Sequence, residues 1–327
     1  MAGTARTFTF ASTGAPDVLT LAEGPLAAPG EGQVQIAQEA IGINYIDVYH
    51  RSGTYPLPLP SGLGVEGAGI IEVLGPGVTG FEPGDRVVYA GGPPGAYATA
   101  RNVPAARVVK LPDDISMEDA ASLFFKGLTV EYLIRRCFKV QAGDKVLFHA
   151  AAGGIGLIAC QWLKALGASV IGTVGSDEKA ALAKDNGCEH PIVYTRENFV
   201  ERVKAITGGE GVPVVYDSIG KDTVMGSLDC LRPRGMLVSF GTASGAVPPL
   251  DLGILGAKGS LMVTRPSIAH YTARRDELEA GAAAVFEMIR TGTIKAVGLK
   301  RYPLAQAEQA HAELEGRKTT GSLILIP

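Results

Sequence analysis

Hydrophobic and polar positions follow two different patterns along the chain, and the change between them falls near residue 116. Up to about residue 110, short β-rich runs are separated by turns that contain Pro and Gly, which is typical of antiparallel β-structure. These runs are QVQIAQEAI, GAGIIEVL, DRVVYA and RVVKL. The segment SMEDAASLFFKGLTVEYLIRR then predicts a helix, because a Ser N-cap and an acidic first turn precede apolar residues at helical spacing.

After this helix, predicted strands and helices alternate. Six apolar runs predict strands at 145–149, 169–174, 191–194, 213–217, 236–240 and 260–264. The connections are short and mostly helical in character, so we expect a parallel sheet with helices on both faces. The last part predicts helices around 272–290 and 304–316 and a closing strand, SLILIP, which we expect to rejoin the first domain.

Length and charge narrow the class of protein. A chain of 327 residues exceeds the size at which one core keeps growing, so two domains are expected. The net charge of -3, with acidic and basic residues mixed and no Lys/Arg cluster, makes nucleic acid an unexpected partner. Polar residues and glycines interrupt the most apolar region, 146–175, so we expect a buried strand, turn and helix there instead of a membrane span.

The amino terminus and the cysteines bear on the compartment. The opening MAGTARTFTFAST lacks the apolar segment of a secretory signal. The cysteines have no C-x-x-C spacing, so we expect reduced thiols and a cytoplasmic protein. They are Cys137, Cys160, Cys188 and Cys230.

The segment HAAAGGIG, residues 149–156, stands between a predicted strand and a predicted helix. Gly153 would let the backbone approach a pyrophosphate, Gly156 would let helix and strand pack closely, and the helix start would offer free amides and a partial positive charge. Ala151 occupies the place of the first glycine of the dinucleotide-binding pattern, so we expect it to make the turn with a methyl group. The turn alone fits a packing turn equally well. The context of six strands favours a nucleotide site.

The end of the second strand of the sheet distinguishes the cofactors. An NAD site usually carries an acidic residue there, whereas SVIGTV ends at Val174 and is followed by Gly175 and Ser176. We expect Asp177 and Glu178 to start the next helix and point outward. The sequence therefore favours NADPH, and the polar candidates for its 2′-phosphate are Ser176, Lys179, Tyr194 and Arg317.

Motifs along nearly the whole chain carry a family resemblance. They are GINYIDVYHRSGTYP, GLGVEGAG, EPGDRVVYA, KGLTVEYLI, HAAAGGIG, VVYDSIG, LVSFGTASG and GRKTTGSLILIP. In order and spacing they resemble the NADPH:quinone oxidoreductases, the zinc-free quinone reductase and zeta-crystallin branch of the medium-chain dehydrogenase/reductase superfamily. The resemblance implies an α/β protein with a GroES-like antiparallel β catalytic domain, 1–126 completed by 267–327. It also implies a Rossmann NADPH-binding domain, 127–266, with a doubly wound six-stranded parallel sheet.

The same resemblance bears on metal chemistry. In zinc-dependent relatives a cysteine stands at the position of Asn44 and a histidine at the position of Val65, and the four-cysteine lobe is missing from GGPPGAYATARN. The resemblance therefore implies no metal site. It implies reduction of a quinone by direct hydride transfer or by one-electron steps. A quinone is already an electrophile, so the protein mainly has to orient donor and acceptor and exclude water.

Residue roles also follow from the resemblance. Asn44 and Tyr49 are expected to border the nicotinamide and substrate as the catalytic residues. The expected cofactor-binding residues are Asn44, Thr129, Gly153, Gly154, Ile155, Ser176, Lys179, Tyr194, Ser218, Phe240, Gly241, Ser244 and Arg317. Each has a structural alternative: Asn44 closes a turn, Tyr49 is a half-buried strand aromatic, and Lys179 and Arg317 are solvated charges.

Other polar residues carry weaker expectations. Tyr55, Glu66 and Lys126 flank the expected cleft, and a structural role fits each of them equally well. His149, at a strand end, is expected to be a packed side chain and not a base.

Two other functions remain open from the sequence. One is an NADPH-dependent reductase of α,β-unsaturated carbonyls, which would use the same cofactor domain. The other is a protein that binds NADPH without catalysis. For any of the three, the family implies a homodimer through an edge strand of the cofactor domain, and SLMVT is the run we select for that edge.

Overall fold

The computed structural model describes residues 3–316 and 318–327, and the chain divides into two compact units. The first, the β unit, comprises the chain up to Leu128 together with Thr272–Thr291 and Lys295–Pro327. The second, the α/β unit, comprises Thr129–Tyr271 and Gly292–Ile294. Each unit has a hydrophobic core of its own.

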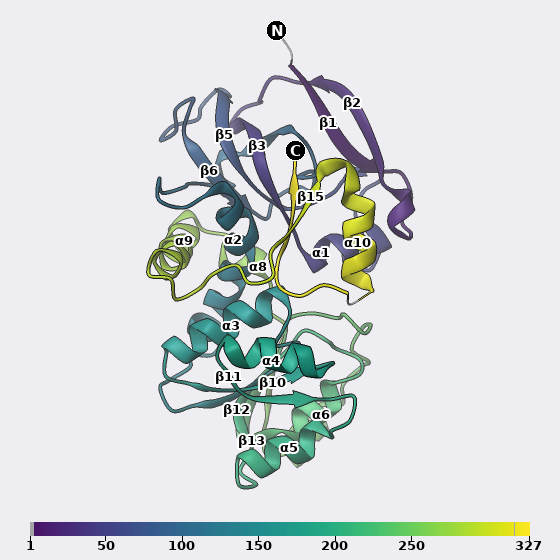
Figure 1. The fold of residues 1–327 in the computed structure, drawn as a ribbon, viewed down its shortest axis with the longest axis vertical. Helices are drawn as coiled ribbons and strands as arrows, with labels where there is room; N and C mark the ends of the chain where they lie inside the picture. Colours follow the sequence, from purple (N-terminus) through teal and green to yellow (C-terminus); the bar gives the residue numbers. More distant parts are fainter. Residues whose placement is uncertain (1–2, 317) are drawn as a thin grey trace. The chain divides into compact units, whose positions relative to one another are not determined.

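The β unit contains two sheets. The larger has the order β15-β16-β3-β5-β6-β8, with β7 also paired to β3, and the smaller has the order β2-β1-β4. Figure 1 labels β3, β5, β6 and β15 of the larger sheet and β1 and β2 of the smaller. Their strands are β1 Gly3–Phe10, β2 Thr20–Leu26, β3 Gln33–Ile43, β4 Ser61–Gly62, β5 Glu66–Leu74, β6 Arg86–Ala90, β7 Ala100–Pro104, β8 Val108–Lys110, β15 Lys300–Pro303 and β16 Leu323–Ile326. The antiparallel pairing of β16 with β3 confirms that the closing strand rejoins the first domain.

The helices of the β unit begin in different ways, and only some of them have a side-chain cap. They are α1 Tyr45–Ser52, α9 Arg275–Arg290, α10 Ala307–Glu315 and the first part of α2 Met117–Glu131. Ser116 caps α2 as predicted, since its Oγ accepts the Asp119 amide at 3.0 Å. The single helix predicted around 304–316 is wrong in one detail: a 3₁₀ turn, η4 Leu304–Gln306, follows Pro303 and precedes α10.

The α/β unit contains a six-stranded sheet whose pairs are all parallel, in the order β11-β10-β9-β12-β13-β14. This order runs outward in both directions from β9 and β12, which confirms the doubly wound sheet. The strands are β9 Lys145–Phe148, β10 Ser169–Val174, β11 Cys188–Val193, β12 Val212–Asp217, β13 Leu231–Ser239 and β14 Met262–Thr264. β11 and β13 begin earlier than predicted because prolines and charged residues interrupt their apolar pattern.

Helices of the α/β unit form two contacting pairs, α3 with α4 and α5 with α6 (Figure 1). Their bounds are α3 Gly154–Ala165, α4 Asp177–Asp185, α5 Phe199–Ile206 and α6 Val224–Asp229, and a further helix, α7, spans Leu252–Ala257. Val203 of α5 and Leu228 of α6 are buried against Leu147 and Val215 of the sheet. Hydrophobic burial on the sheet therefore fixes the strand ends that the candidate site uses.

Candidate functional site

The glycine-rich turn connects β9 to α3 and differs from the expectation in one residue. Ala150 has the left-handed backbone conformation, with φ of 55°, and its carbonyl accepts the Gly153 amide at 2.9 Å. Ala151, which we expected to make the turn, is fully buried, and its methyl lies so near β10 that a Cβ on Gly172 would approach it to 2.6 Å. An alanine is tolerated at position 151 because its neighbour adopts the unusual conformation.

Gly156 is required by close packing, as predicted, although its contact is with the turn and not with a strand. A Cβ at this position would lie 2.2 Å from the Ala150 carbonyl oxygen and 2.8 Å from the Ala151 Cα. Gly153 is less crowded, because a Cβ there would lie 3.2 Å from the same oxygen.

The first turn of α3 fits an anionic ligand. Its N-cap is Gly153, which provides no side-chain hydrogen bond to the helix start. By contrast, Ser176, Asn198 and Asp251 cap α4, α5 and α7 with their own side chains. The backbone amides that begin α3, at Gly154 and Ile155, therefore point to an open helix end that suits a pyrophosphate.

Candidates for the 2′-phosphate lie after β10 and β11. Ser176 caps α4 by accepting the Lys179 amide at 3.3 Å, so its hydroxyl already has a structural role. Tyr194 is 44% exposed, and its hydroxyl lies over Gly175, where a Cβ would approach it to 3.1 Å. Asp177 and Glu178 start α4 and are exposed, as predicted. Arg317, the fourth candidate, lies outside the described residues.

Residues after β12 and β13 are brought together as predicted. The Ser218 carbonyl accepts the Ala243 amide at 3.1 Å, and a Cβ on Gly241 would lie 2.6 Å from that carbonyl oxygen. Phe240 stacks at a tilt on Phe148, with ring centroids 5.7 Å apart. The hydroxyl of Ser244 donates to the Ile219 carbonyl at 2.9 Å and accepts the Asp222 amide at 3.0 Å, so this side chain holds the loop.

Beneath these loops lies a buried polar network that the sequence analysis did not identify. Asp217 accepts from the amides of Ile219 and Gly220 and from the hydroxyl of Ser227, at 2.8 to 3.0 Å. The ring of His149 lies within hydrogen-bonding distance of Ser227 and of Thr173, at 3.0 and 2.9 Å. Burial lowers the pKa of His149, and with 1% exposure it is a packed side chain, as expected. The only signal in the sequence was an acidic residue ending the apolar run VPVVYD.

In the β unit, Asn44 begins α1. Its backbone amide donates to Asp47 Oδ2 at 2.9 Å, and its side-chain Nδ2 donates to Glu66 Oε2 at 2.8 Å. Tyr49 lies inside the same helix and is buried, with its ring 5.2 Å from that of Tyr45 and 4.9 Å from that of Tyr55. The alternative that Tyr49 is a strand residue is therefore wrong.

Glu66 and Lys126 form a buried ion pair beside Asn44. Lys126 Nζ lies 3.7 Å from Glu66 Oε2, and Glu66 Oε1 accepts the Phe125 amide at 2.7 Å. Burial raises the pKa of Glu66, while the Lys126 ammonium acts in the opposite direction. Gly42 makes room for this carboxylate, since a Cβ there would lie 2.0 Å from Oε2. Both residues were expected to flank the cleft, but their contact was not predicted.

A second buried chain of polar groups joins α1 to α10. Asp47 Oδ2 accepts the Tyr97 hydroxyl at 3.0 Å, and that hydroxyl lies 2.9 Å from His311 Nε2. Burial raises the pKa of Asp47 to about 7 and lowers that of His311 to about 3. Arg51 of α1, also buried, pairs with Glu315 of α10. None of these contacts was predicted.

Thr129 lies in α2 and is buried. Its place at the start of the α/β unit is known, but its contacts with a cofactor remain a prediction.

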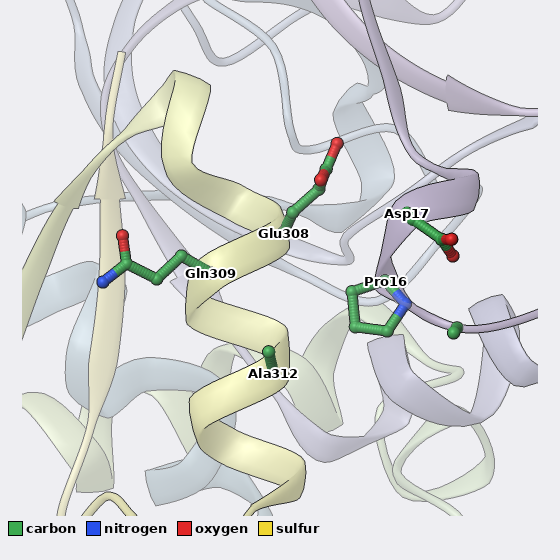
Figure 2. Close-up of a pocket in the computed structure, with 6 residues that line it drawn as sticks. Pro16, Asp17, Glu308, Gln309 and Ala312 are labelled. Carbon is green, nitrogen blue, oxygen red and sulfur yellow. The ribbon is translucent and has the colours of Figure 1, made fainter.

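A pocket of about 440 Å³ lies between η1 (Pro16–Val18) and α10 (Figure 2). Ala15, Pro16, Asp17, Glu308, Gln309 and Ala312 line it. None of the residues predicted to bind cofactor or substrate is among them. We therefore do not assign the chemistry to this pocket.

Three further findings concern the residues that the structure describes. Among them, no three His, Cys, Asp or Glu side chains are grouped so that they could hold a metal ion. No helix of the described chain is both long and apolar enough to cross a membrane. The four cysteines are free, and all but Cys137 are buried.

Comparison with known proteins gives full-length matches. Residues 30–113 match the family described as "Alcohol dehydrogenase GroES-like domain", and residues 154–287 match "Zinc-binding dehydrogenase". A quinone oxidoreductase of Pseudomonas aeruginosa is 51% identical over 99% of this chain and 100% of its own length. A 2-haloacrylate reductase of Burkholderia is 46% identical over 96% of each chain. The crystal structure of Escherichia coli quinone oxidoreductase complexed with NADPH is 51% identical, with a TM-score of 0.97 over 99% of this chain and 100% of that one.

Proposed function

Because this chain belongs to the quinone oxidoreductase family of the medium-chain dehydrogenase/reductase superfamily, we propose that it reduces quinones with NADPH. The observation that carries the proposal is the open N-terminus of α3 at the carboxyl end of β9, in a doubly wound sheet whose β10 ends without a carboxylate. When bound, NADPH supplies the hydride. One- and two-electron reduction of the acceptor both fit the site.

The α/β unit would bind the cofactor. The amides of Gly154 and Ile155 suit the pyrophosphate, because they lie at a helix start without a side-chain cap, and Gly153 is proposed to let the backbone approach it. We propose that the 2′-phosphate is bound by Lys179, Tyr194 and Arg317. Ser176 is proposed to bind it as well, because it lies at the start of α4. Ser218, Phe240, Gly241 and Ser244 line the ends of β12 and β13, the edge where open α/β sheets bind ligands. Thr129 is proposed as a further cofactor contact.

The β unit would supply the catalytic residues, with 1–126 and 267–327 as the catalytic domain and 127–266 as the cofactor domain. Asn44 is proposed to contact the reacting end of the cofactor and the substrate. Glu66 fixes its amide, because a buried charge-assisted hydrogen bond holds Nδ2 in one direction. Tyr49 is proposed to relay the proton that the reduced quinone takes up, and transfer from solvent is the alternative.

Asn44 and Val65 occupy positions where zinc-dependent relatives carry a cysteine and a histidine. Neither side chain is a ligand that zinc prefers, so we propose hydride transfer that does not use zinc at these positions. The proposal rests on the types of these two residues. It agrees with a quinone acceptor, which needs no Lewis acid.

The test is a steady-state comparison of acceptors with NADPH and with NADH. 1,4-Benzoquinone, 9,10-phenanthrenequinone and a short enal would be compared at equal concentration by the loss of nicotinamide absorbance. We expect the quinones with NADPH to give the highest kcat/KM. A preference for the enal would overturn the assignment.

A second candidate is reduction of a conjugated carbon–carbon double bond, as in the NADPH-dependent reductases of α,β-unsaturated carbonyls. The observation that favours it is the 46% identity to a 2-haloacrylate reductase. Adding 2-chloroacrylate to the acceptor panel separates the two candidates.

A third possibility is NADPH binding without catalysis. The variant Gly153→Val addresses it, since Gly153 has more room than Gly156 and the variant is expected to fold. Loss of quinone-dependent NADPH oxidation in a folded variant would exclude this possibility. Intact activity would show that the pyrophosphate binds elsewhere.

We also propose a homodimer through the edge strand β14 and a cytoplasmic location. Support for the dimer is that β14 pairs only with β13 in the described chain and exposes Met262 and Val263. Support for the location is the set of free thiols, which suits a reducing compartment.

A further inference from the structure

An ion pair joins the start of α4 to the loop after β11. Arg196 Nη1 donates to Asp177 Oδ2 and Nη2 donates to Oδ1, both at 2.5 Å. The two side chains are more than half exposed, at 57% and 66%. The pair therefore lies at the surface, where solvent and a ligand can reach it.

The pair lies next to the end of β10. The Tyr194 amide donates to the Val174 carbonyl at 3.1 Å, and the Thr195 hydroxyl donates to the Gly175 carbonyl at 3.4 Å. These two bonds hold the loop against the residues that follow β10. They place Arg196 beside Asp177, three residues beyond the last residue of that strand.

A carboxylate near this strand end is the group that binds the ribose hydroxyls of NAD and repels the 2′-phosphate of NADPH. In this chain both oxygens of Asp177 accept from Arg196, so the carboxylate is occupied and its charge is balanced. A guanidinium has five N–H donors, and the pair uses two of them. The remaining donors suit a phosphate, which guanidinium groups bind in a forked geometry.

Other charged side chains lie near the pair, and Glu197 has partners of its own. Glu197 accepts the Val193 amide at 3.0 Å and the Arg202 guanidinium at 2.9 Å. Glu178 and Lys179 lie in the first turn of α4 with Asp177. Arg196 therefore balances the charge of Asp177.

We propose that Arg196 determines cofactor specificity, by covering Asp177 and by donating to the 2′-phosphate of NADPH. This inference rests on the proposed function, and it adds a residue to Ser176, Lys179, Tyr194 and Arg317. The role of Asp177 then depends on Arg196. While Arg196 pairs with it, the Asp177 carboxylate does not repel the 2′-phosphate of NADPH. Without Arg196, the free carboxylate favours NADH.

The test uses the full chain with 2′,5′-ADP and 5′-AMP as probes, titrated by calorimetry, and with NADPH and NADH, titrated by nicotinamide fluorescence. Arg196→Ala is expected to weaken 2′,5′-ADP and NADPH by about tenfold and to leave 5′-AMP and NADH unchanged or tighter. Asp177→Asn is expected to tighten 2′,5′-ADP. The double variant Arg196→Ala with Asp177→Asn is expected to bind 2′,5′-ADP more tightly than Arg196→Ala alone.

A matched control exists in the β unit. Arg274 makes the same two-bonded, exposed pair with Asp276, at 3.0 and 2.7 Å. Arg274→Ala changes the net charge equally and is expected to leave all four affinities unchanged.

The outcomes separate this inference from the proposed function. If the unaltered chain binds NADPH no more tightly than NADH, the proposed cofactor is wrong. If it prefers NADPH but Arg196→Ala keeps the same ratio of affinities, or if Arg274→Ala lowers it equally, the role of Arg196 is overturned and the proposed function stands. A double variant as weak as Arg196→Ala would contradict the covering of Asp177.

Discussion

Several side chains of the β unit place ionisable groups in the interior, among them Glu66 with Lys126, Asp47, and Arg51, which pairs with the half-buried Glu315. Burying a charge is costly unless it is paired and hydrogen-bonded, and a buried pair stabilises a protein little compared with an apolar replacement. Glu66 also accepts from Asn44, so we propose that this buried pair orients the Asn44 amide.

For this pair we expect Glu66→Gln to lower the free energy of unfolding by about 3 to 5 kcal/mol, because Lys126 is left buried without its counter-charge. The double variant Glu66→Met with Lys126→Met removes both charges and also the acceptor of Asn44, and it should recover part of this loss in urea unfolding. If Glu66 orients Asn44, the folded double variant should still show a lower kcat with a smaller change in KM. Glu118→Gln, which breaks the exposed pair with Arg301, is the control and should have little effect. Full kcat in the double variant would contradict the orienting role.

Tyr49 gives a separate prediction about the proton. Tyr49→Phe keeps the ring contacts with Tyr45 and Tyr55 and removes only the hydroxyl. If Tyr49 relays a proton, kcat for quinone reduction should fall by about 10²-fold or more, with a changed pH profile. Turnover that stays the same across pH would leave solvent as the proton source.

Asp47 should make stability depend on pH in an unusual direction. Its pKa is raised in the folded state to about 7, above its unfolded value, so the folded protein holds more protons between about pH 4 and pH 7. Its contribution to stability is present at low pH and lost as pH rises through 7. Asp47→Asn removes this dependence, so the stability difference between the unaltered chain and the variant should shrink by roughly a few kcal/mol from pH 4 to pH 7.5.

His311 makes stability depend on pH in the opposite direction. The unaltered chain and the Asp47→Asn variant both contain this residue. Its pKa is lowered by burial to about 3, so its contribution is present above its unfolded pKa and is lost as pH falls toward 3. Comparing the two proteins by urea unfolding at each pH cancels this contribution. A difference that stays constant with pH would mean that Asp47 ionises normally in the folded protein.

Among the elements, α3 depends on a glycine for its position. Gly156→Ala would place a methyl 2.2 Å from the Ala150 carbonyl, and the backbone has to move to admit it. We expect a loss of about 1 to 3 kcal/mol in the free energy of unfolding, together with weaker NADPH binding. Gly256→Ala is the matched control, since Gly256 is also helical and a Cβ there meets nothing within 4 Å. The control should be neutral or stabilising by about 0.5 to 1 kcal/mol. Equal effects at both positions would contradict the packing role of Gly156.

Elements were predicted better than the contacts between them. Apolar runs identified all six parallel strands, because a strand buried on both faces is marked by its own residues. The position of the left-handed residue was missed by one, since both Ala150 and Ala151 are alanines and nothing local distinguishes them. Glu66 with Lys126 and His149 with Ser227 were missed because each pair is brought together only by folding, over 60 and 78 residues of sequence.

At the scale of the whole molecule, the edge strand β14 determines the proposed assembly. Val263→Lys places a charge on the exposed edge, and we expect it to convert a dimer into a monomer in light scattering after size exclusion. Val73→Lys is the control, because Val73 is exposed to a similar extent, 42% against 40%, in β5 of the other unit. A monomeric unaltered chain, or equal masses for all three proteins, would refute the homodimer.

Pairing of β3 with β16 also has a consequence in time. Ile41, Gly42 and Ile43 pair with residues 323–325, about 280 positions later, whereas the α/β unit is almost continuous in sequence. At a translation rate of about 5 to 20 residues per second, the partner strand is synthesised roughly 15 to 55 s after these three residues. The nascent β unit stays incomplete over that interval, and it is in this window that the growing chain would need protection by chaperones.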